Sequence, residues 1–131
     1  MNEALRKKTR TVTGLLRSRS ERLVLAESCT GGRLAALFTE TPGASDLFCG
    51  SFVSYREASK TAWLGVDAKT LKRFSAVSPE TANAMVRDAI RKTREATIAG
   101  AVTGYLGPRG KRVGLVYLAV LRRGERRATV L

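Results

Sequence analysis

Residues 23–32 read Leu-Val-Leu-Ala-Glu-Ser-Cys-Thr-Gly-Gly and decide the fold of this chain. A short apolar run ends in an acidic residue, hydroxyl groups and a thiol follow at its tip, and a glycine pair leads into the helical pattern of residues 33–39. This order predicts a buried strand, a tight turn and a helix. The free N–H groups and the positive dipole end of such a helix suit an anion or a developing oxyanion. A purely structural strand-to-helix connection has the same pattern, so the turn alone does not decide between chemistry and structure.

Helical and strand patterns alternate on both sides of this turn. Residues 2–20 predict an N-terminal amphipathic helix, ahead of an α/β core over residues 21–131. Further helices are predicted at residues 32–39, 56–63, 68–74 and 79–92, and strands at residues 22–26, 48–54, 96–102, 113–121 and 126–130. The small apolar residues of the third strand suit a central position that is covered on both faces. Together these elements predict a single three-layer α/β/α domain with a mixed, mostly parallel sheet.

Size and composition support one domain. The chain has 131 residues, of which 44% are hydrophobic, enough for one core and too few for two comfortable domains. It contains no run of eighteen apolar residues, and its first twenty residues lack the apolar centre of a secretory signal. We therefore expect a soluble, cytoplasmic protein with no membrane partner, in which Cys29 and Cys49 are free thiols.

The formal net charge of +13 raises the question of a polyanionic partner. The excess lies in residues 6–22, 69–73, 87–94 and 109–127, which belong to several predicted elements and do not form one stripe. Aromatic residues make up 6% of the chain and are not interleaved with arginines in the way that stacks bases. A solvated basic surface explains the charge better than a nucleic-acid site, which is the weakest of our functional hypotheses.

The absence of histidine narrows the chemistry. It excludes a Ser-His-Asp triad and a Cys-His dyad and, with only two cysteines, the usual zinc sites. Near the second strand, Tyr55 and Lys60 are the residues that could act as a base in its place. In open α/β sheets ligands bind beyond the carboxyl ends of the strands, so the loops at residues 27–32, 51–60 and 103–110 are expected to converge on one pocket.

An ordered series of motifs resembles the C-terminal domain of the CinA family, over about residues 21–121. The motifs are Ala26-Glu27-Ser28-Cys29-Thr30-Gly31-Gly32, Thr41-Pro42-Gly43-Ala44-Ser45, Ser54-Tyr55-Arg56-Glu57-Ala58-Ser59-Lys60, Leu64-Gly65-Val66, Ala76-Val77-Ser78, and Thr103-Gly104 with Gly107-Pro108. The resemblance implies a three-layer α/β/α domain with a mixed sheet. It also implies the family's activity in pyridine nucleotide recycling, in which the carboxamide of nicotinamide mononucleotide is hydrolysed to nicotinic acid mononucleotide and ammonia.

The resemblance also implies roles for individual residues. Ser28 would be the nucleophile, and Tyr55 and Lys60 would activate it and move protons, a contribution of roughly 10² to 10⁴-fold in rate. Backbone N–H groups at residues 30–32 would stabilise the oxyanion by about 3 kcal/mol per donor. The small-molecule nucleotide would need neither metal nor cofactor, and the residues expected to bind it are Glu27, Thr30, Gly31, Gly32, Thr103, Gly104 and Arg109.

Each role has an alternative. Ser28 could cap the following helix, and Tyr55 and Lys60 could be an aromatic residue at a strand end and a solvated helix residue. Cys29 is a rival nucleophile, although small cysteines beside strands usually pack. Glu27 either orients Lys60 or pairs with a neighbouring arginine.

The chain departs from the family on the substrate side. Family members usually have a longer glycine-rich stretch after Gly107-Pro108 and continue into a C-terminal helix, whereas this sequence stops at Leu131. It also has no counterpart of the N-terminal pyrophosphatase-like domain of the long family members. The missing helix would leave one sheet face exposed unless the N-terminal helix, a chain end or a second subunit of a homo-oligomer covers it. A catalytically degenerate domain that binds or senses a nucleotide is therefore our second hypothesis.

Overall fold

The computed structural model describes residues 2–108, 110 and 112–131. In this part of the chain five strands form one sheet in the order β2-β1-β3-β4-β5. The strands are β1 (Leu23–Glu27), β2 (Phe48–Val53), β3 (Ile98–Gly104), β4 (Val116–Arg122) and β5 (Thr129–Val130). β1 pairs in parallel with β2 and β3, whereas β4 runs antiparallel to β3 and to β5. The predicted mixed sheet is confirmed, with its parallel half centred on β1.

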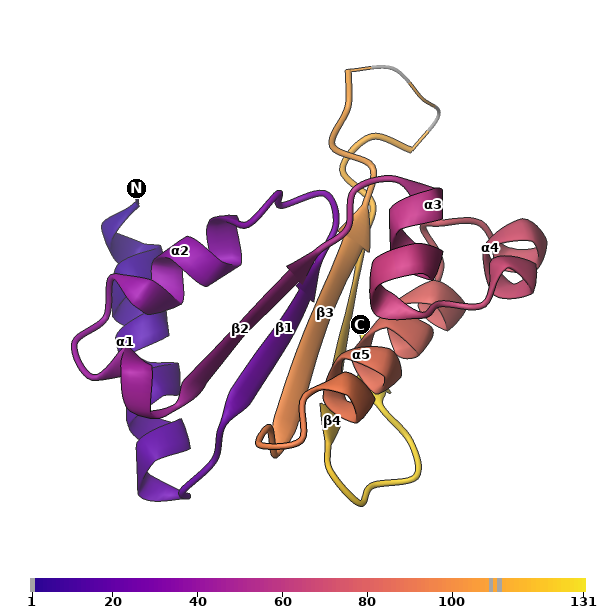
Figure 1. Cartoon of the computed structure of the whole chain (residues 1–131). Helices are drawn as coiled ribbons and strands as arrows, with labels where there is room; N and C mark the ends of the chain where they lie inside the picture. Colours follow the sequence, from indigo (N-terminus) through magenta and orange to yellow (C-terminus); the bar gives the residue numbers. More distant parts are fainter. Residues whose placement is uncertain (1, 109, 111) are drawn as a thin grey trace.

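Helices cover both sides of the sheet, as the three-layer prediction requires (Figure 1). On one side lie α1 (Glu3–Ser18), α2 (Arg33–Thr39) and the 3-10 helix η1 (Ala44–Asp46). On the other side lie α3 (Glu57–Ser59), the π-helix η2 (Lys60–Leu64), α4 (Ala68–Phe74) and α5 (Pro79–Lys92). The predicted bounds of α4 and α5 are confirmed, because Asp67 and Ser78 cap their first turns through side-chain oxygens that accept backbone N–H groups.

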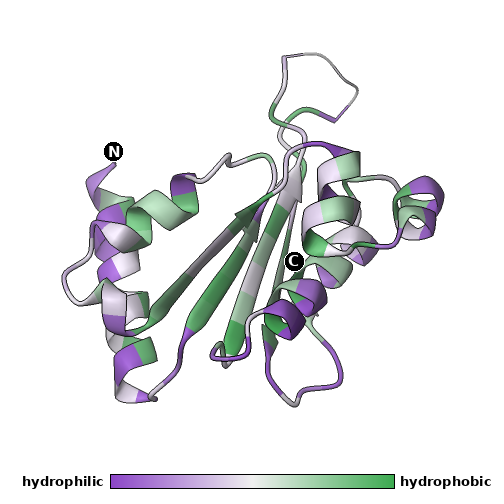
Figure 2. Ribbon diagram, viewed as in Figure 1, coloured by the Kyte–Doolittle hydropathy of each residue, from purple (hydrophilic) through white to green (hydrophobic). Residues whose placement is uncertain are grey.

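Strand β1 sends alternate side chains into two hydrophobic cores. Leu23 and Leu25 pack with α1 and α2 on one face, and Val24 and Ala26 pack with α5 on the other. Figure 2 shows these apolar strands between helices whose polar residues are mostly turned outward. Because successive side chains of a strand point to opposite faces, the two residues that follow Ala26 are also directed toward different layers.

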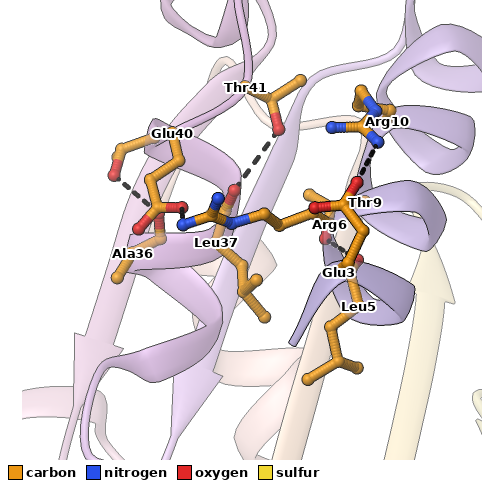
Figure 3. Close-up of polar contacts among 10 residues, drawn as sticks. Glu3, Leu5, Arg6, Thr9, Arg10, Ala36, Leu37, Glu40 and Thr41 are labelled. Carbon is orange, nitrogen blue, oxygen red and sulfur yellow. Dashed lines mark hydrogen bonds and ion pairs between the residues drawn. The ribbon is translucent and has the colours of Figure 1, made fainter. Parts of the chain in front are cut away.

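The N-terminal helix α1 is held mainly by Leu16, which is 6% exposed in the core beneath it. Figure 3 shows the polar contacts near its other end, where Arg6 reaches Glu40 just beyond α2 at 3.4 Å and Arg10 pairs with Glu3 at 2.9 Å. Both ion pairs are largely exposed, so each contributes about 1 kcal/mol or less. Burial of Leu16, with Thr9 and Thr13 on the same helix, therefore attaches the predicted amphipathic helix more than its surface ion pairs do.

The strands at the far end of the sheet differ from their predicted bounds. β4 begins at Val116 and not at residue 113, and β5 contains only Thr129 and Val130 of the predicted residues 126–130. β3 begins and ends two residues later than expected, so Thr103 and Gly104 belong to the strand and the loop starts at residue 105. The predicted exposed sheet face is present on β4, where Leu118 and Val120 are 42% and 45% exposed. Among the described residues, no helix is both long and apolar enough to cross a membrane, and Cys29 and Cys49 are free thiols.

Candidate functional site

Ser28 and Lys60 form a buried pair at the carboxyl end of β1. Lys60 Nζ donates to Ser28 Oγ at 2.8 Å. Lys60 is 1% exposed and Ser28 is 7% exposed. Ser28 follows β1 directly, and its side chain continues the alternation toward the layer that contains η2 and α5. The structure thus brings together two of the three predicted catalytic residues, which are 32 positions apart in the sequence.

Two backbone carbonyls hold the Lys60 amine in place. Nζ also donates to Ser54 O at 2.8 Å and to Tyr55 O at 3.2 Å. An ammonium has three N–H donors and a neutral amine has two, so neutral Lys60 keeps both carbonyls and directs its lone pair at the Ser28 hydroxyl. Burial lowers the pKa of Lys60, against the opposing effects of Glu57 and Cys29, and a lower pKa increases the neutral fraction. The geometry suits a general base for Ser28.

The π-helix η2 sets the position of Lys60 in the chain. The Gly65 N–H donates to the Lys60 carbonyl, five residues earlier, at 3.0 Å, which is the wider turn of a π-helix, and the Val66 N–H closes the helix end on the same carbonyl at 3.0 Å. Such turns occur often at functional sites. The regular helix predicted at residues 56–63 is therefore wrong in detail, because apolar periodicity does not report a change in backbone hydrogen bonding.

The turn after β1 leaves backbone donors close to Ser28. The N–H of Gly31 donates to the Ser28 carbonyl at 3.1 Å, so the expected oxyanion role cannot fall to Gly31. In the part of the chain that the structure describes, the N–H groups of Thr30 and Gly32 have no oxygen acceptor. Gly31 and Gly32 have φ values of +58° and +95°, which favour glycine. Of the three expected donors, Thr30 and Gly32 therefore remain, and the Cys29 N–H likewise has no oxygen acceptor among the described residues.

Glu27 has a position that neither of its predicted roles anticipates. Its carboxylate is fully buried on the α2 side of β1 and contacts neither Lys60 nor an arginine among the described residues. It accepts hydrogen bonds of 2.7–3.2 Å from Thr30 Oγ1, Leu34 N, Ala35 N and Ser51 Oγ. The N-cap residue of α2, Gly32, has no side chain, so Glu27 supplies the cap from the preceding strand. The N-terminus of α2, which the sequence predicted to bind an anion, already binds the Glu27 carboxylate through Leu34 N and Ala35 N. Glu27 is buried and is not accessible to a substrate.

Tyr55 contributes its backbone and not its phenol to the pair. Its side chain is 71% exposed, and within the described residues no hydrogen bond joins its hydroxyl to Ser28 or Lys60. Any proton transfer between the Tyr55 hydroxyl and the Ser28–Lys60 pair therefore requires a bound substrate between them.

Cys29 is a poor rival for Ser28. Burial raises the pKa of the Cys29 thiol, although Lys60 and neighbouring backbone N–H groups act in the opposite direction. A raised pKa reduces the fraction of thiolate, which is the nucleophilic form. The alternative nucleophile is thus less favoured than the serine beside the amine.

The residues expected to bind substrate at the end of β3 are engaged within the fold. Thr103 is 1% exposed, and its Oγ1 donates to Ala76 O at 2.7 Å. Gly104 lies so close to β4 that an added Cβ would be 2.7 Å from Val116 Cγ2. Arg109 lies outside the described residues. The Thr103 side chain and the Gly104 backbone therefore secure the strand end, and the Thr103 hydroxyl does not face a ligand.

Sequence reasoning missed Ser54 as part of the site. Its carbonyl holds Lys60, and its own Oγ is buried with no hydrogen-bond partner among the described residues. Nothing in a side-chain pattern identifies a backbone carbonyl as a functional group. The only available signal was its place in the motif that also contains Tyr55 and Lys60.

Comparisons with known proteins identify relatives of this chain. A family model described as the CinA C-terminal domain matches residues 5–131. CinA-like proteins of Chlorobium phaeovibrioides and Myxococcus xanthus are 44% and 45% identical over 117 and 109 residues, which cover 86% and 80% of this chain. The same matches cover 27% and 26% of those proteins, so the chain spans about a quarter of their length.

Solved structures show the same fold. The crystal structure of the competence/damage inducible protein CihA from Agrobacterium tumefaciens has a TM-score of 0.91 and 37% identity, covering 97% of this chain and 78% of that chain. A CinA superfamily protein from Escherichia coli has a TM-score of 0.90 and 31% identity, covering 97% of this chain and 76% of that chain.

Proposed function

The chain belongs to the CinA C-terminal domain family, and on that premise we propose that it hydrolyses nicotinamide mononucleotide to nicotinic acid mononucleotide and ammonia. Ser28 is the nucleophile and Lys60 is its base. The observation that carries this proposal is the 2.8 Å contact between Lys60 Nζ and Ser28 Oγ, buried in a chain that has no histidine. The longer relatives contain further segments, and the proposal concerns this domain.

The first half of the reaction acylates Ser28. Neutral Lys60 accepts the hydroxyl proton while Oγ attacks the carboxamide carbon. The N–H groups of Thr30 and Gly32 stabilise the negative oxygen of the tetrahedral intermediate, at about 3 kcal/mol per well-placed donor. Protonated Lys60 then gives its proton to the departing nitrogen, so ammonia leaves and an ester remains on Ser28.

The second half returns the enzyme to its starting state. Lys60 removes a proton from a water molecule, which attacks the ester carbon. The second tetrahedral intermediate collapses, and Lys60 returns the proton to Ser28 Oγ as the acid product leaves and loses its remaining proton to solvent to become the carboxylate. The Tyr55 hydroxyl contacts neither Ser28 nor Lys60, so it takes part only through a contact with the bound substrate.

Release of ammonia from nicotinamide mononucleotide by the purified chain is the direct test. We expect the wild-type protein to release ammonia and Ser28→Ala to release none above background. Ser45→Ala, which alters an exposed serine of η1, is the matched control and should keep full activity. A wild-type protein that binds the nucleotide and releases no ammonia would instead support the degenerate binding domain.

A further inference from the structure

We infer that Glu27 is a positioning residue, whose buried carboxylate fixes the turn that carries the nucleophile by capping α2 from the end of β1. The inference rests on the proposed role of Ser28. It assigns Glu27 neither to the substrate, nor to Lys60, nor to an arginine, the three partners that the sequence suggested.

The surroundings of Glu27 show that its charge is used within the fold. The side chain is 0% exposed, and the donors that reach its oxygens are neutral hydroxyl and backbone N–H groups. A buried carboxylate is costly unless its lone pairs are hydrogen-bonded, and bonds to a charged acceptor are stronger than neutral ones. A glutamate with this complete set of donors holds its neighbours in one arrangement.

These donors come from three segments that surround the nucleophile. Thr30 belongs to the turn, Leu34 and Ala35 begin α2, and Ser51 lies in β2. Ser28 lies in the chain between Glu27 and Thr30. The hydrogen bond from Thr30 Oγ1 to the Glu27 carboxylate therefore joins the residues on either side of it.

The backbone of Ser28 is tied as well. Its N–H donates to Val102 O and its carbonyl accepts from Gly31 N, both at 3.1 Å. The Glu27 contacts complete this restraint from the opposite face of the sheet, and Ser28 Oγ stays 2.8 Å from Lys60 Nζ. A misplacement of about 1 Å at a reacting group costs on the order of 10²-fold in rate, so such a restraint has catalytic value.

Glu27→Gln tests this role with little change of shape. The hydroxyls of Thr30 and Ser51 can rotate and accept from the new amide, but a backbone N–H only donates. Because Leu34 N binds Oε1 and Ala35 N binds Oε2, the single amide oxygen leaves one of these N–H groups unpaired in either orientation. The variant therefore weakens the cap and leaves the three contacts of Lys60 untouched.

The readout is the rate at which a fluorophosphonate probe labels Ser28, because it reports the nucleophile without the nucleotide. Well below the melting temperature of each protein, Glu27→Gln should label about 10 to 100-fold more slowly than wild type. The midpoint of the pH dependence of labelling should be unchanged, since it follows Lys60. Glu40→Gln makes the same change at an exposed site just after α2 and should label at the wild-type rate.

Ser51→Ala provides a second, milder variant. It removes one donor and keeps both helix N–H contacts, so labelling should slow by less than tenfold, and it serves if Glu27→Gln does not fold. Wild-type labelling rates in both variants would overturn the inference, as would a shifted pH midpoint, which would mean that Glu27 acts on Lys60. Wild-type protein that the probe does not label would overturn the proposed function itself, and this inference with it.

Discussion

Replacing Lys60 by methionine separates its role as a base from its role in packing. Methionine has a similar length and an adaptable apolar chain, so it can fill the space of the buried stem. The substitution removes the amine that touches Ser28 Oγ at 2.8 Å. A positioned base contributes roughly 10² to 10⁴-fold, so kcat should fall by that factor, or about 3 to 5 kcal/mol in activation free energy. KM should change less than kcat, because Lys60 moves protons at the reacting atoms and, at 1% exposed, binds no other part of the nucleotide in this mechanism.

The assay is ammonia release from nicotinamide mononucleotide between about pH 6 and about pH 10. Because burial lowers the pKa of Lys60, wild-type kcat should rise with pH and level off below the ordinary lysine pKa of 10.5. Lys60→Met should lack this rising limb, and so should Lys60→Arg, because a guanidinium does not lose its proton. Lys69→Met, on the exposed surface of α4, is the matched control. If Lys60→Met kept more than about a tenth of the wild-type kcat, Lys60 would not be the base.

The same substitution has an effect on stability with a definite sign. The pKa of Lys60 is lower in the folded than in the unfolded protein, so the unfolded chain binds more protons between the two values. Wild-type stability therefore rises with pH across that interval and is lost again as the pH falls through the folded pKa. Methionine does not titrate, so any stability advantage of Lys60→Met at neutral pH should shrink at alkaline pH, as measured by denaturant unfolding.

Two further predictions concern the scaffold. Gly104→Ala should destabilise the fold by about 1 to 3 kcal/mol, because the new Cβ would lie 2.7 Å from Val116 Cγ2. Gly14→Ala in α1 should stabilise the fold by about 0.5 to 1 kcal/mol, because no atom lies within 4 Å of the added Cβ and alanine favours a helix. Thermal denaturation measures both, and equal effects would contradict the close approach of β3 and β4. Burial and the neighbouring Glu95 carboxylate raise the pKa of Cys49 to about 11. In a variant without Cys29, the alkylation rate of Cys49 should therefore keep increasing above pH 9.0, the usual pKa of a thiol. A plateau near pH 9 would refute this, since it would indicate an ordinary thiol.

Much of the fold followed from local signals in the sequence. Ser78-Pro79 and Asp67 mark the starts of α5 and α4, because a cap and the first helical turn are adjacent in the chain. The strand, turn and helix at residues 23–39 follow from an apolar run and a glycine pair for the same reason. The family resemblance, which adds the order of motifs along the whole chain, is confirmed over residues 5–131.

The composition of the chain determined by itself that a nucleophile here would have to act without histidine, and its motifs, through the family resemblance, pointed to Ser28 with Tyr55 and Lys60 as the activating groups. Only the tertiary structure decided that the side chains of Ser28 and Lys60 meet, because the contact depends on where η2 lies against β1. It also decided that Glu27 caps α2 and that Thr103 turns into the fold. The physical reason is the same in each case. Caps and turns are made by neighbours in the chain, whereas strand order, the alternation of faces and the positions of backbone carbonyls bring together groups that no local pattern connects.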